Sequence, residues 1–135
     1  MKIRVLALAA GSFFVFGPLV AFAHHAFSSE FDKNKPVTLN GTVSKVDWAK
    51  PHAYIYLDAK NESGKTEQWK LETANPDFLT KQGLKQTSLK KGTKLTVNGY
   101  AATKNAHLAS ARMVTMADGK SLQVGNPAED GGPAK

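Results

Sequence analysis

The strongest constraint on the fold is a two-residue alternation of apolar and polar side chains between Val37 and Trp48. This period predicts a β-strand with one buried face. The parity slips around Ser44-Lys45, because the next apolar residue is Val46. One extra residue there predicts a β-bulge, which lets a long strand coil around a barrel, and Gly41 fits the same sharp bend.

Shorter segments with the same period follow along the chain. Further strands are predicted at residues 52–60, 66–72, 94–100 and 109–116, with 121–124 extending the sheet. Gly64 fits a hairpin loop, and Asn75 and Gly83 fit the start and end of a short helix. This order predicts an all-β fold, an OB-like barrel of five to six strands with one short helix between strands three and four. A six-stranded sandwich is the competing architecture, and the helix favours the barrel.

The apolar positions of these strands predict one shared core. Its members all fall on the inward face of the alternation, namely Val43, Val46, Ile55, Leu57, Trp69, Leu71, Leu95, Val97 and Val114. The chain has no cysteine, so disulfides contribute nothing and this core must stabilise the domain alone. The net charge of +7 is spread over many lysines, which is typical of a solvated surface that weakly favours acidic partners.

The two ends of the chain differ from this middle part. Lys2 and Arg4 precede an apolar run that ends in Ala21-Phe22-Ala23, the pattern of a secretory signal. We therefore expect residues 1–23 to be a cleaved signal peptide and the protein to be periplasmic or secreted; an uncleaved membrane anchor is the alternative. No later segment is apolar enough to span a membrane. Residues 24–36 are predicted as an N-terminal arm, 37–124 as the β domain and 125–135 as a disordered tail.

Cleavage after Ala23 makes His24 the new N-terminus, followed directly by His25. A terminal histidine offers its free amine and its imidazole in one chelate ring, and copper(II) favours such nitrogen donors in tetragonal geometry. Exported copper carriers and oxidative polysaccharide-cleaving enzymes use an N-terminal histidine in this way, and the arm resembles theirs at that one point. The alternative is a frayed terminus without a ligand.

Two further histidines lie in predicted loops. His52 ends the loop between strands one and two, and His107 lies in or beside the loop between strands four and five. These loops share one pole of an OB barrel, so we expect the two side chains to be neighbours. The predicted metal ligands are therefore His24, His25, His52 and His107, with copper(II) as the cofactor.

A second candidate surface lies on the outer face of strands two and three. Tyr54, Tyr56 and Lys70 resemble the stacking platforms of single-strand nucleic-acid binders. Export argues against a nucleic acid and leaves a glycan, a peptide or another exported protein as the partner. The alternative is that the tyrosines simply pack on a half-exposed sheet.

The chain also resembles a family of small exported proteins of Gram-negative bacteria with no assigned function. The matching residues include His24-His25-Ala26-Phe27, Glu30-Phe31-Asp32, Lys35-Pro36-Val37-Thr38-Leu39, Gly41-Thr42-Val43, Trp48, Pro51-His52-Ala53, Ser88-Leu89-Lys90, Gly92, Val97, Gly99-Tyr100, Ala111-Arg112, Val114-Thr115 and Asp118-Gly119. The chain departs from the family pattern at Lys50, usually Asn, and at Lys91, usually Pro. The resemblance implies export and an OB-like fold, and it implies no activity.

These observations predict an exported binding protein rather than an enzyme, because no catalytic motif is found. Copper(II) binding through the mature N-terminus is the sharpest hypothesis. The alternative is a non-catalytic periplasmic adaptor that holds a glycan or a protein on the face with Tyr54 and Tyr56.

Overall fold

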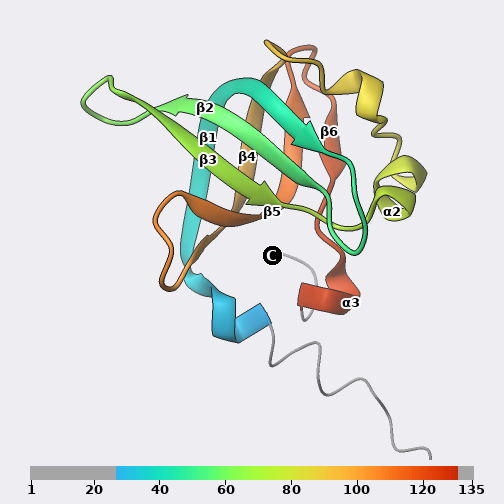
Figure 1. Ribbon diagram of the computed structural model, residues 1–135, viewed down its shortest axis with the longest axis horizontal. Helices are drawn as coiled ribbons and strands as arrows, with labels where there is room; N and C mark the ends of the chain where they lie inside the picture. Colours follow the sequence, from blue (N-terminus) through green and yellow to red (C-terminus); the bar gives the residue numbers. More distant parts are fainter. Residues whose placement is uncertain (1–26, 131–135) are drawn as a thin grey trace, which may run out of the picture.

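The computed structural model describes residues 27–130 (Figure 1). The predicted signal peptide at residues 1–23, the histidines His24 and His25, and residues 131–135 lie outside the described residues. None of the helices between residues 27 and 130 is long and apolar enough to cross a membrane.

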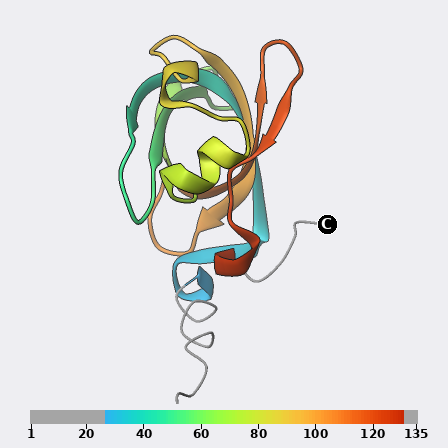
Figure 2. The ribbon, with the colours of Figure 1, turned by 90° about the vertical axis from the view of Figure 1, so that its right-hand side faces the viewer.

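Within residues 27–130, six strands form one mostly antiparallel sheet. They are β1 (Phe31–Asp47), β2 (Tyr54–Lys60), β3 (Thr66–Glu72), β4 (Lys94–Ala102), β5 (Leu108–Met116) and β6 (Ser121–Gln123). The strand order is β3-β2-β1-β4-β5-β6, and a parallel pairing of β3 with β5 closes the sheet into a ring. The short helices α2 (Pro76–Lys81) and η1 (Gln86–Ser88) lie between β3 and β4, and α3 (Pro127–Asp130) follows β6 (Figures 1 and 2). The all-β, OB-like arrangement is confirmed, and ring closure excludes the sandwich.

The long first strand bends where the sequence predicts. Its register against β2 shifts between Val43 and Lys45, which is the predicted bulge. A β-carbon on Gly41 would collide with the carbonyl oxygen of Asp58 on the neighbouring strand. Only glycine therefore permits β1 and β2 to approach this closely.

The start of the first strand was predicted wrongly. β1 begins at Phe31, not at residue 37, and Phe27–Glu30 form a helical turn before it. Phe31 is only 3% exposed and pairs with Ala102 of β4. The register shift between Phe31 and Pro36 places exposed polar residues between two paired regions, so the segment shows no period in the sequence. Part of the predicted arm is thus the first part of the sheet.

The predicted core is confirmed. Seven of its members are buried in one cluster, and Val46 and Trp69 are half-buried and packed against it. Leu79 of α2 and Leu84 close the cluster from the side of the helix. Helix α2 itself begins as predicted, because the side chain of Asn75 accepts a hydrogen bond of 2.9 Å from the Phe78 N–H.

The C-terminal segment is more ordered than predicted. Val124 is fully buried, and its carbonyl oxygen accepts a hydrogen bond of 2.7 Å from the Ala74 N–H. The Gly125 N–H donates to the Arg112 carbonyl, and helix α3 follows at Pro127–Asp130. Residues 125–130 thus contain a backbone hydrogen bond and a short helix where the sequence predicted a disordered tail. The glycine and proline content of this segment is typical of disorder, but the segment packs through backbone hydrogen bonds.

Candidate metal site and the outer sheet face

His52 lies just before β2 and is held by a backbone hydrogen bond. Its Nδ1 is 2.9 Å from the carbonyl oxygen of Thr73. A carbonyl oxygen can only accept, so Nδ1 is the donor of this hydrogen bond, and the tautomer that makes it has its lone pair on Nε2. Metal-binding histidines use this arrangement, because the hydrogen bond fixes both the tautomer and the orientation of the ring.

Glu72 at the end of β3 lies beside this histidine. Its Oε1 is 3.8 Å from His52 Nδ1, and the Tyr54 hydroxyl donates to its Oε2 at 3.3 Å. His52 and Glu72 line a small cavity together with Thr73, Ser110 and other residues. Its volume of about 10 Å³ is close to the space that one water molecule needs, and an ion of similar size fits the same space.

The first described residues lie close to this cavity. Phe27 is buried, with its ring centroid 5.4 Å from that of Phe31 and 6.5 Å from that of Tyr100. Tyr100 pairs with Ser110, and Ser110 pairs with Glu72. With neighbouring strands about 4.8 Å apart, the backbone of Tyr100 is therefore about 10 Å from that of Glu72. The chain thus enters the domain two strands away from His52 and Glu72.

His107 occupies a different place. Its Nε2 is 3.2 Å from Glu67 Oε2, and its ring lies edge-on to Trp69 at 5.2 Å between centroids. Glu67 and Glu72 are about 16 Å apart along β3, and their odd separation turns their side chains to opposite faces. The structure does not bring His52 and His107 together, contrary to the expectation that they are neighbours. No group of three or more His, Cys, Asp or Glu side chains that suits a metal occurs within residues 27–130.

The tyrosine face lies on the outside of β2 and β3, as the strand parity predicts. The Lys70 ammonium lies 4.2 Å from the centroid of the Tyr54 ring, and the Lys45 ammonium lies 5.0 Å from that of Tyr56. Lysines therefore cover the ring faces that a stacking ligand would use.

Charged neighbours hold Tyr56 and its lysine in place. The Tyr56 hydroxyl donates to Asp47 at 3.2 Å, and Lys45 pairs with the same carboxylate at 3.0 Å. The hydrogen bond from Lys45 lowers the pKa of Asp47. Sequence reasoning missed Lys45, Asp47 and Glu72, which complete these networks.

Burial raises the pKa of the Tyr54 phenol to about 12, and the negative charge of Glu72 adds to the effect. We expect Glu72→Gln to lower this pKa part of the way toward the usual value of about 10, because burial remains. The raised pKa favours folding below about pH 10, and this contribution is lost as the pH rises through about 12. A titration of the tyrosine ring resonances by nuclear magnetic resonance measures the pKa. Glu67→Gln, on the opposite face, is the matched control; a Tyr54 that titrates near 10 in the unmodified protein contradicts the burial.

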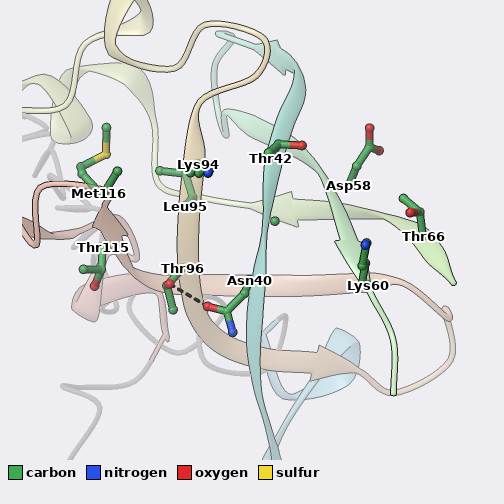
Figure 3. A pocket seen from close by; sticks show the side chains of 12 residues that line it. Asn40, Thr42, Asp58, Lys60, Thr66, Lys94, Leu95, Thr96, Thr115 and Met116 are labelled. Carbon is green, nitrogen blue, oxygen red and sulfur yellow. Dashed lines mark hydrogen bonds between the residues drawn. The ribbon is translucent and has the colours of Figure 1, made fainter. Parts of the chain in front are cut away.

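A large groove lies on another part of the outer surface. It measures about 1000 Å³ and crosses β1, where Asn40 and Thr42 line it together with Lys94 and Thr96 of β4 (Figure 3). The Thr96 hydroxyl donates to Asn40 Oδ1 at 2.7 Å. This groove has a mixed polar and apolar lining and contains none of the predicted site residues.

The comparisons with known proteins identify a family for this chain but assign no activity to it. No curated protein and no solved structure matches the chain. A protein-family match covers residues 14–110, from the predicted signal peptide to the first part of β5. The chain belongs to the DUF6152 family, a family of unknown function.

Proposed function

We propose that the protein is exported, that it is cleaved after Ala23, and that its new N-terminus binds one copper(II) ion together with His52. The main support for this proposal is the geometry of His52. Its Nδ1–H donates to the Thr73 carbonyl, and the carboxylate of Glu72 lies beside it. This hydrogen bond favours the tautomer with its lone pair on Nε2, which is the tautomer that such metal-binding histidines use.

The chain length supports the pairing of His24 with His52. His24 lies three positions before Phe27, a reach of about 10 Å. Phe27 packs on Tyr100, whose backbone is about 10 Å from that of Glu72. The amine and imidazole of His24 are therefore within range of the cavity that His52 and Glu72 line.

The donor set of the proposed site suits copper(II). The terminal amine, the His24 imidazole and His52 Nε2 supply three nitrogens, and Glu72 supplies a negative charge beside them. Copper(II) prefers tetragonal nitrogen and oxygen ligands and binds such sites more tightly than the other divalent metals of its row. His25 offers one further imidazole, and His107 is outside this set because it is paired with Glu67.

A copper(II) titration of the processed protein tests the proposal. We expect His52→Ala to weaken binding about tenfold or more, because one of three nitrogens is lost. His107→Ala is the matched control and should change the affinity by less than about twofold. The electron paramagnetic resonance spectrum should lose a nitrogen ligand only in the first variant.

Equal affinities of the two variants would show generic histidine binding and contradict the proposal. The adaptor with Tyr54, Tyr56 and Lys70 would then be the better hypothesis. The lysines that lie over its two tyrosine rings make it the weaker one at present.

A further inference from the structure

One long stretch of the chain carries positive charge without negative charge. Between Asp77 and Asp118 the sequence contains no acidic residue. The lysines of the α2–β4 connection are all exposed, as is Lys120 after it. Together they form the basic rim, defined as Lys81, Lys85, Lys90, Lys91, Lys94 and Lys120.

The fold gathers these lysines along one margin of the ring. The connection from α2 through η1 to β4 runs up one side and over one end of the sheet (Figures 1 and 2). There the Gly92 N–H donates to the Val43 carbonyl at 2.7 Å. Lys120 joins the margin from the β5–β6 hairpin, because its Nζ is 3.8 Å from the point where a β-carbon on Gly83 would stand.

The lysines of the rim differ from others in their pairing. Lys35, Lys45 and Lys50 each have a carboxylate oxygen within 4 Å, at 3.9, 3.0 and 2.6 Å. In the part of the chain that the structure describes, no rim lysine forms such an ion pair. Asp77 precedes Lys81 by about one helical turn, and Asp118 accepts a hydrogen bond of 2.9 Å from the Lys120 N–H, so the field of the six lysines is reduced but remains positive.

The side chains between the rim lysines indicate how a partner is held. The exposed residues there are small or polar, such as Gln86, Thr87 and Gly92. Binders of single-stranded nucleic acids place aromatic rings between their basic residues, and no aromatic side chain occurs between Lys81 and Lys94. A planar anionic surface needs only ammonium groups along an exposed margin, each contributing about fivefold to affinity.

We propose that the basic rim docks the protein on a membrane surface of anionic lipid headgroups. The helical turn at Phe27–Glu30 lies at the end of the ring opposite to η1 (Figures 1 and 2). A protein docked through the rim therefore keeps its N-terminal end directed away from the lipid. The interaction is electrostatic, so it weakens strongly when salt shortens the Debye length from about 10 Å at 0.1 M toward about 4 Å at 0.5 M.

Sedimentation of the processed protein with phosphatidylcholine vesicles that contain about one third phosphatidylglycerol tests the proposal. We expect binding at about 0.1 M salt, little binding at about 0.5 M, and none to pure phosphatidylcholine. The triple variant Lys85→Gln, Lys90→Gln and Lys91→Gln should bind about a hundredfold more weakly. The matched control Lys60→Gln, Lys65→Gln and Lys104→Gln removes the same charge from exposed sites outside the rim and should lose less than about fivefold.

An equal loss in both triple variants would overturn the proposal, since net charge rather than the rim would then govern binding. Failure to bind the anionic vesicles at low salt would also overturn it. So would tighter binding of a single-stranded oligonucleotide than of the vesicles. All six substituted lysines are exposed, so we expect both triple variants to retain the fold. Thermal unfolding of both variants checks this.

Discussion

Adding one residue before His24 is expected to weaken copper(II) binding by the processed protein about as much as His24→Ala does. In the proposed site the terminal amine and the imidazole of the same residue close one chelate ring. An added residue converts that amine into an amide and moves the new amine out of the ring. Loss of the chelate should cost on the order of a hundredfold in affinity or more, measured by isothermal titration.

This comparison separates the terminus from the side chains, because the extended protein keeps every histidine. Intact mass first establishes that the unmodified chain begins at His24. His107→Ala again serves as the control that removes an imidazole from outside the site. Equal affinity of the extended and native termini would contradict chelation by the N-terminus.

Gly99→Ala is expected to be the most destabilising single methyl addition in the sheet. A β-carbon on Gly99 would overlap the carbonyl oxygen of Ser110 on β5. The backbone atoms that it meets cannot rotate away, so β4 and β5 must separate. We expect the free energy of unfolding to fall by about 3 kcal/mol or more, at the upper end of overpacking costs.

Gly64→Ala is the matched control for this prediction. Nothing lies within 4 Å of a β-carbon there, but the backbone has a φ of +82°. Its cost is therefore conformational alone, about 1–2 kcal/mol. Urea denaturation measures both variants, and a fall for Gly99→Ala no larger than that for Gly64→Ala would show that the strands adjust without strain.

The strands were predictable because each has one buried face, which appears in the sequence as an apolar residue at every second position. Val43 and Leu57 follow the alternation, and the parity slip after Val43 located the bulge correctly. The start of β1 was not predictable, because Phe31 is paired while the residues after it leave the register. The packing of Val124 depends on partners such as Ala74, which no local pattern reveals.

The candidate site shows the same limit. His52 and His107 were predicted as metal ligands from their residue type. Only their positions in two loops suggested that their side chains are neighbours. Their partners Glu72 and Glu67 lie on opposite faces of β3. The odd separation of these two residues along the predicted strand already implied this. The pairing of Tyr54 with Glu72 also followed from the predicted hairpin, so the carboxylate beside His52 was within reach of sequence reasoning.

Closure of the ring depends on pairings between residues that lie far apart in the sequence. β1 pairs with β2, the next strand along the chain, and also with β4, where Phe31 meets Ala102 about 70 positions later. The ring closes only when β5 pairs with β3, and the buried Val124 follows still later. Such distant pairings make folding slow compared with that of helical domains of the same size. A chain that is synthesised from its N-terminus therefore cannot close the ring before β5 has been made.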